Sequence, residues 1–133
     1  MKFITRLPVI PGTLLLLACV FPSGSDAAQS SGGQKKQAII FLNTQQGKEN
    51  QLAREINRQL YFSRTLSRQL DVTLIDISPG GPALSGAARY LRDTSGIWVA
   101  KYRPLSLPAL FCLQGKSRHF YHLTTAEDIR KCL

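Results

Sequence analysis

The stretch LPALF, at residues 107–111, begins the most legible part of this 133-residue chain. A proline followed by a continuous apolar run is typical of a buried strand that starts at the proline, and we expect this strand over residues 109–113. The residues QGKS at 114–117 predict a turn, and residues 118–123 predict a second strand that pairs with the first as a hairpin. The stretch therefore begins a predicted β-hairpin.

A helix is expected after this hairpin. Thr124 or Thr125 is suited to cap its start, two acidic residues follow in the first turn, and two basic residues occupy the last turn. The helix dipole favours this order of charges. We expect the helix to pack against the sheet.

Earlier in the chain, residues 37–43 (QAIIFLN) predict a buried strand, and the loop TQQGK at 44–48 leads into a long helix over residues 48–70. Residues 71–78 then alternate in polarity and predict another strand, which breaks at PGGP, residues 79–82.

A short helix is expected over residues 84–92, where four apolar side chains share a face. Residues 97–102 are apolar enough for a helical turn or a strand, and both alternatives stay open. The predicted order is strand, helix, strand, helix, strand, strand, helix. This order predicts an α/β fold with a central four-stranded mixed sheet and about three flanking helices.

That order, with Pro108 at a strand start, resembles thioredoxin-like proteins over most of residues 37–133. A redox thioredoxin keeps a Cys-x-x-Cys motif directly after the first of these strands, where residues 44–48 hold no cysteine. The resemblance therefore implies the thioredoxin-like scaffold without its redox activity. It also implies that Pro108 is a cis-proline beside a groove that holds extended peptides, whereas a trans proline that only starts a strand is the alternative.

Within that fold, the motif YRP at 102–104, the LPALF stretch, Gly115 and the aromatic strand after it resemble small exported proteins of bacterial integrating conjugative elements. This second resemblance implies an accessory role in conjugation or secretion.

The first 28 residues have the pattern of a signal peptide. Lys2 and Arg6 precede an apolar stretch over residues 9–21, and small residues follow. The sequence LLAC ending at Cys19 also resembles a lipobox, which would make Cys19 a lipidated N-terminus, and a retained anchor is the third alternative. Residues 29–36 (QSSGGQKK) predict a flexible linker to a single domain over residues 37–133. We therefore expect a periplasmic protein or a membrane-anchored lipoprotein.

Two cysteines, Cys112 and Cys132, remain once Cys19 is assigned to the signal segment. An oxidising compartment favours a disulfide bond between them. Such a bridge would constrain the unfolded chain by about 3 kcal/mol. Two buried free thiols are the alternative, and the spacing does not resemble a redox motif.

The net charge of the chain is +9, and removal of residues 1–28 leaves the domain strongly basic. A basic surface attracts anionic partners. For an exported protein we expect an acidic protein partner in the cell envelope first, a membrane surface second and DNA last. The sequence does not indicate an oligomeric state.

The predicted helix over residues 48–70 separates its side chains into two faces. Apolar residues gather on one side, and the opposite side carries Arg54, Arg58, Tyr61, Arg64 and Arg68. A solvated face is one interpretation. A docking surface is the other, because arginine and tyrosine are enriched in interfaces.

Few residues are candidates for chemistry. His119 and His122 lie three apart on a predicted strand and should point to opposite faces, so they do not suit one metal ion. Acidic residues are scattered, which gives no support to a pair of catalytic carboxylates. We expect no catalytic residue, no metal and no cofactor.

The function expected from these features is that of a non-enzymatic scaffold in a conjugative transfer or secretion apparatus, which binds a protein partner. The alternative is a thiol-disulfide protein that uses Cys112 and Cys132.

Overall fold

The computed structural model describes residue 12 and residues 34–133. The predicted signal segment apart from residue 12, the lipobox cysteine Cys19 and most of the predicted linker lie outside the described residues.

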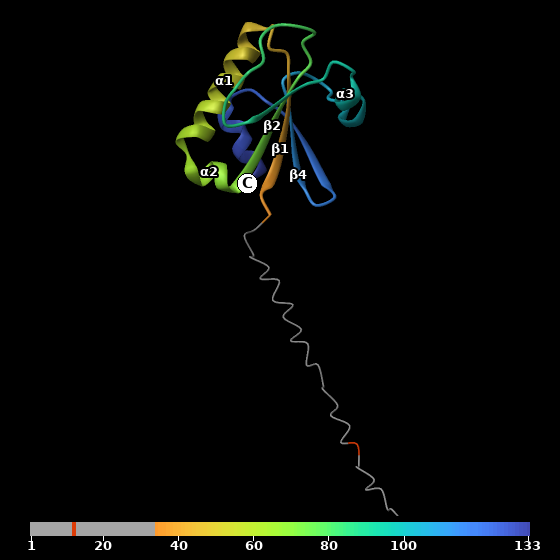
Figure 1. Cartoon of the computed structure of the whole chain (residues 1–133). Helices are drawn as coiled ribbons and strands as arrows, with labels where there is room; N and C mark the ends of the chain where they lie inside the picture. Colours follow the sequence, from red (N-terminus) through yellow and green to blue (C-terminus); the bar gives the residue numbers. More distant parts are fainter. Residues whose placement is uncertain (1–11, 13–33) are drawn as a thin grey trace, which may run out of the picture. The chain divides into compact units, whose positions relative to one another are not determined.

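One mixed sheet of five strands, in the order β3-β2-β1-β4-β5, forms the centre of the described domain (Figure 1). The strands are β1 (Lys36–Leu42), β2 (Leu70–Asp76), β3 (Arg89–Arg92), β4 (Ala109–Gln114) and β5 (Ser117–His122). The first three are parallel to one another, β4 is antiparallel to β1, and β5 is antiparallel to β4. The sheet has one strand more than the four expected.

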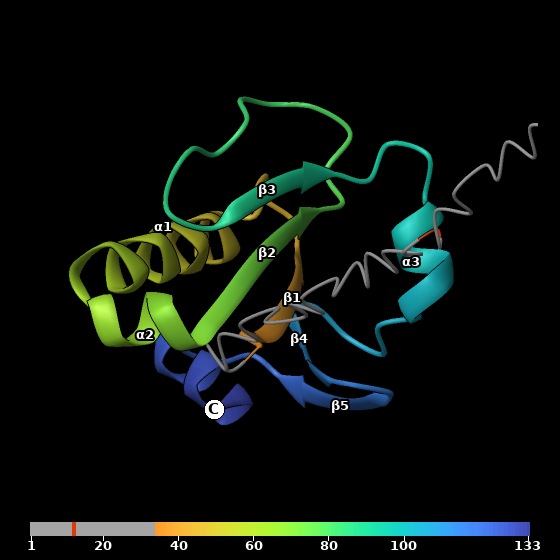
Figure 2. The same cartoon turned by 60° about the horizontal axis from the view of Figure 1, so that its bottom comes forward.

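The helices cover the two faces unequally (Figure 2). Among the described residues, one face carries α1 (Gly47–Phe62), α2 (Arg64–Gln69) and the 3-10 helix η1 (Ala126–Cys132), whereas the other carries only the short α3 (Ile97–Tyr102). Thr125 starts η1 as expected, and its backbone N–H donates to Asp128 at 3.0 Å.

Each face of the sheet has its own apolar core. Ile40, Leu74 and Leu110 pack beneath α1 and η1, and Ile56 of α1 is fully buried against them. Phe41, Phe111 and Tyr102 form the core beneath α3, with ring centroids 5.3–5.7 Å apart. The continuous apolar run in β1 serves both faces, because successive side chains of a strand point in opposite directions.

The structure divides the single helix expected over residues 48–70 at Ser63. This residue is extended, with φ −105° and ψ 97°, and its N–H donates to the Gln59 carbonyl at 2.9 Å. Its Oγ accepts from the Leu66 N–H at 3.2 Å, so Ser63 ends α1 and caps α2. The break lets Leu60 and Leu66 both reach the core.

The helix expected over residues 84–92 is absent, and β3 replaces its second half. A contact with α1 explains the difference, since Asn57 Oδ1 accepts from the Ala88 N–H at 2.9 Å. Gly86 lies so close to Asn57 that an added Cβ would be 2.4 Å from Cγ. The loop is therefore held against α1, and the next residues extend along β2.

Residues 97–102 form a helix, which settles the alternative that the sequence left open. The buried Asp93 carboxylate accepts from the backbone N–H groups of Trp98 at 3.2 Å and Val99 at 2.9 Å. These bonds satisfy amide groups at the start of the helix, which have no partner within it.

Candidate functional site

A buried polar cluster lies where the parallel strands end. Asp76, fully buried at the end of β2, accepts from the Thr44 N–H at 3.1 Å and from its hydroxyl at 2.6 Å. It also accepts from the Ser78 N–H at 2.9 Å and from the Tyr90 hydroxyl at 2.6 Å. One carboxylate thus holds together the loops that follow β1 and β2.

The charge of Asp76 is stabilised by these bonds. Burial alone would raise its pKa, but the hydrogen bonds from Thr44, Tyr90 and Ser78 outweigh burial and lower the pKa from 3.8 to about 2. Arg92 adds a cation 3.7 Å away and donates to the Gly81 carbonyl at 2.7 Å. A carboxylate in this state is ionised at neutral pH and does not suit proton transfer. The cluster can fix the shape of the loop over residues 44–46, where a redox thioredoxin carries its cysteines.

Sequence reasoning missed this cluster, because its members come from three separate strands or loops. The available signal was a carboxylate near the end of a predicted strand, shortly before the break at residues 79–82.

The peptide bond between Leu107 and Pro108 is cis, and Pro108 lies directly before β4. Its carbonyl accepts from the Leu123 N–H at 3.0 Å. The predicted role of this position in holding an extended peptide stays a prediction.

Cys112 on β4 and Cys132 on η1 lie at disulfide distance, with their Cα atoms 5.0 Å apart. Both are buried, with 8% and 7% of their surface exposed. The bond joins η1 to the centre of the sheet. His119 faces Cys112 across the β4–β5 pair, whereas the His122 ring lies on the other face and contacts the Ser106 hydroxyl at 3.1 Å.

The predicted docking residues lie on two helices rather than on one. Arg54, Arg58 and Tyr61 are on α1, Arg64 and Arg68 are on α2, and all five are exposed. We call these five residues together with Phe62 the arginine surface.

An aromatic pair lies at the junction of the two helices. Tyr61 is 75% exposed, Phe62 is 74% exposed, and their rings contact each other edge to face at a centroid distance of 5.1 Å. In a single helix over residues 48–70, helical spacing would put Phe62 at the margin of the apolar face. The break at Ser63 instead leaves it in solvent.

The arginines of this surface differ in their contacts. Arg54 donates to Asn50 at 2.9 Å, and Arg58 lies 3.7 Å from Glu55. Within residues 34–133, no carboxylate lies within 4.0 Å of Arg64 or Arg68. The guanidinium groups on α2 are therefore available to an anionic partner.

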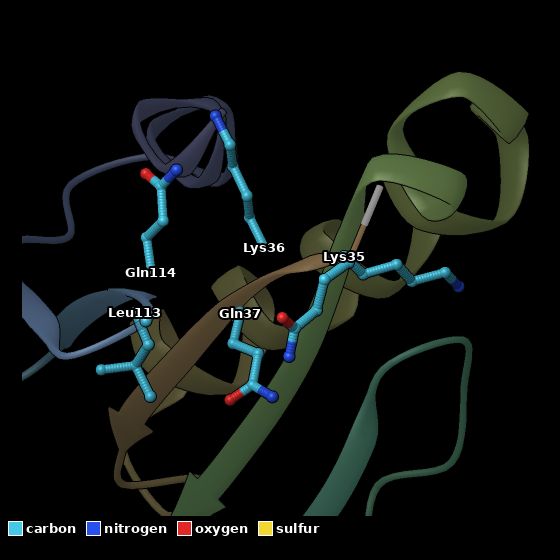
Figure 3. Close-up of a pocket in the computed structure, with 7 residues that line it drawn as sticks. Lys35, Lys36, Gln37, Leu113 and Gln114 are labelled. Carbon is cyan, nitrogen blue, oxygen red and sulfur yellow. The ribbon is translucent and has the colours of Figure 1, made fainter. Parts of the chain in front are cut away.

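A pocket of about 290 Å³ lies at the end of the sheet away from Asp76, between the start of β1 and the end of β4. Figure 3 shows Lys36 and Gln114 extending toward η1, whereas Lys35 points away from them. The Lys36 amine donates to the Leu133 carbonyl. This lysine therefore joins β1 to η1, and its position is explained without a ligand.

In the part of the chain that the structure describes, no helix is long and apolar enough to cross a bilayer. Residues 34–133 also bring together no group of three or more side chains that could ligate a metal ion.

Comparisons with known proteins inform the fold of this domain. No protein family model matches the chain, and no curated protein matches its sequence. Among solved structures, StoA from Bacillus subtilis is similar with a TM-score of 0.52 over 74% of this chain and 81% of that one, at 11% sequence identity. A likeness at this identity concerns the fold alone. It confirms the predicted fold class, and the domain is a thioredoxin-like α/β domain.

Proposed function

We propose that this chain is a non-enzymatic accessory protein of the cell envelope, a scaffold in a conjugative transfer or secretion apparatus, and that its arginine surface binds an acidic protein partner. The exposed pair Tyr61 and Phe62, which lies between Arg58 and Arg64 in the sequence, is the observation that carries the proposal.

Two aromatic rings in solvent are costly for a monomer, because their apolar area is removed from water only when something covers it. Tyrosine and arginine are also residue types that carry much of the energy of protein interfaces. A partner that offers an apolar pocket ringed by carboxylates would match both features of this surface.

The first test neutralises the surface by Arg54→Gln, Arg58→Gln, Arg64→Gln and Arg68→Gln. A photoreactive residue at position 61 first crosslinks the partner in producing cells, and the purified pair is then measured by calorimetry. We expect the quadruple variant to bind at least about fourfold more weakly, since each exposed ion pair contributes about 0.2–1 kcal/mol and four such pairs are lost.

The matched control removes the same charge elsewhere, through Lys35→Gln, Lys48→Gln, Arg103→Gln and Lys116→Gln. These side chains are exposed and lie outside the arginine surface. Equal weakening in both variants would show that only net charge matters. Unchanged binding in the first variant would remove this surface as the docking site.

A membrane surface and DNA are the other anionic partners of a basic exported protein. Sedimentation with vesicles that contain an anionic lipid tests the first. A DNA titration tests the second, for which binding must weaken steeply as salt rises. Strong binding in either assay, lost in the quadruple variant, would replace the protein partner.

Thiol-disulfide exchange is the second candidate, and it is favoured by the position of His119 opposite Cys112. A histidine beside a cysteine is a common feature of reactive thiols. This candidate predicts equilibration with a glutathione buffer in the folded state, whereas a structural bridge resists reduction until the domain unfolds.

A further inference from the structure

A groove of about 380 Å³ lies on the α3 side of the sheet, far from the arginine surface on the other face. Ile39, Thr73 and Leu91 line it from three adjacent strands, and Trp98 lines it from α3. This volume falls within the range of ligand pockets, about 300–1,000 Å³.

The groove exists because α3 covers only part of its face. Tyr102 packs against Phe41 and Phe111, at centroid distances of 5.6 and 5.3 Å, and the Arg118 guanidinium lies 4.8 Å from the Tyr102 ring. These contacts place α3 over β1, β4 and β5. No helix among the described residues lies over β2 and β3 on this face.

Two cations and one carboxylate, that of Asp71 on β2, border the groove, so the charge around it is net positive. Arg89 on β3 and Lys101 on α3 are both exposed, and neither has a carboxylate within 4.0 Å among residues 34–133. The Lys101 amine instead lies 5.6 Å from the centre of the Trp98 ring. Because apolar and cationic groups meet here, the groove suits a ligand that is both apolar and anionic.

The neighbouring strand is an edge. Within the described domain β3 pairs only with β2, so the backbone groups of alternate β3 residues are left to solvent. An extended segment can pair with such an edge and place alternate side chains in an adjoining pocket.

We propose that this groove binds an extended acidic peptide, which pairs with β3, inserts one apolar side chain against Trp98 and Leu91, and directs flanking carboxylates toward Arg89 and Lys101. The chain's own residues 29–36 do not fit, because they carry lysines and no acidic residue. This site is independent of the function proposed above, which uses the opposite face of the sheet.

The probe is a blocked pentapeptide, Asp-Thr-Leu-Thr-Asp. In an extended chain its two aspartates and its leucine share one face, and each aspartate lies about 7 Å from the leucine along the strand. Trp98 is the only tryptophan of the chain, so its fluorescence reports the groove directly. We expect a saturable change with the full-length protein, and little change with Lys-Thr-Leu-Thr-Lys or with Thr-Asp-Leu-Asp-Thr, which places its aspartates on the other face.

The test variant combines Arg89→Gln and Lys101→Gln. It should bind the acidic peptide about five- to tenfold more weakly, as two exposed ion pairs allow. The control combines Lys48→Gln and Lys116→Gln, which remove the same charge from exposed positions outside both the groove and the arginine surface, and it should bind as the unaltered protein does. A proline in place of the first threonine of the peptide removes a backbone donor and should also weaken binding.

Four results would overturn the proposal. The first is equal binding of the acidic and basic peptides, and the second is unchanged binding in the Arg89 and Lys101 variant. The third is no fluorescence change with any peptide up to about 10 mM. Absence of binding at this concentration would mean that the binding free energy is less than about 3 kcal/mol. A change with AMP but with no peptide would also overturn it, since it would identify a small-molecule site instead.

Discussion

At the scale of single residues, Asp76 makes a prediction about pH. Its pKa is about 2 in the folded domain against an ordinary value of 3.8. The stability that it contributes is therefore fully present above about pH 4 and is lost as the pH falls through about 2. The shift corresponds to about 2 kcal/mol. We expect urea unfolding at pH 7 to show that Asp76→Asn lowers the free energy of unfolding by about this amount. Between pH 7 and pH 2, the variant should lose less stability than the unaltered protein does.

Asp71→Asn is the control for this prediction, because Asp71 is a partly exposed carboxylate at the other end of β2. Some acid sensitivity should remain in both variants, since backbone hydrogen bonds from Thr125 and Thr124 lower the pKa of Asp128. An Asp76→Asn variant as stable as the unaltered protein at pH 7 would show that the cluster is not structural.

At the scale of elements, the break between α1 and α2 depends on a side chain. Ser63→Ala removes the oxygen that accepts from the Leu66 N–H, and loss of such a cap costs about 1 kcal/mol. Ser67→Ala is the matched control, because the Ser67 hydroxyl only bonds back to the Arg64 carbonyl within the helix. Urea unfolding should separate the two variants by at least about 0.5 kcal/mol. Equal stability would mean that packing alone bends the chain here.

At the scale of the whole molecule, Cys112 and Cys132 connect the sheet to η1 across a separation of 20 residues. Closing a loop of this length removes entropy from the unfolded chain, and we expect the double variant Cys112→Ala and Cys132→Ala to lose about 3 kcal/mol in urea unfolding. For a domain of this size that is a large share of the total stability. The oxidised and reduced forms of the unaltered protein should differ by a similar amount. A difference below about 1 kcal/mol would show that packing of η1, rather than the covalent link, holds this end of the domain.

Local patterns were sufficient for the hairpin and for most of the remaining elements. The apolar run after Pro108, the turn at Gly115 and the aromatic strand after it predicted β4 and β5 directly. The fold class followed from the order of the elements and is confirmed by the likeness to StoA.

The errors occur where distant residues decide the local structure. The residues before Arg89 have a weak helical pattern, but they do not form a helix. The Ala88 N–H instead donates to Asn57, about 30 residues earlier in the chain, and the residues that follow pair with β2. Likewise, nothing near Asp76 in the sequence identifies Thr44 and Tyr90 as its partners. The candidate site could therefore be predicted only in part, because the arginines follow a helical period whereas the buried cluster and the groove depend on strand order.

The contact between Lys36 and Leu133 brings the two ends of the described domain together. Ends that lie side by side can be joined by a short linker without disturbing a fold, and the chain can then be opened at another exposed loop. The loop over residues 79–83 is largely exposed, and opening the chain there would cut no strand of the sheet. The same architecture is thus compatible with a circularly permuted gene, in which β3 rather than β1 would be the first strand of the domain to be synthesised.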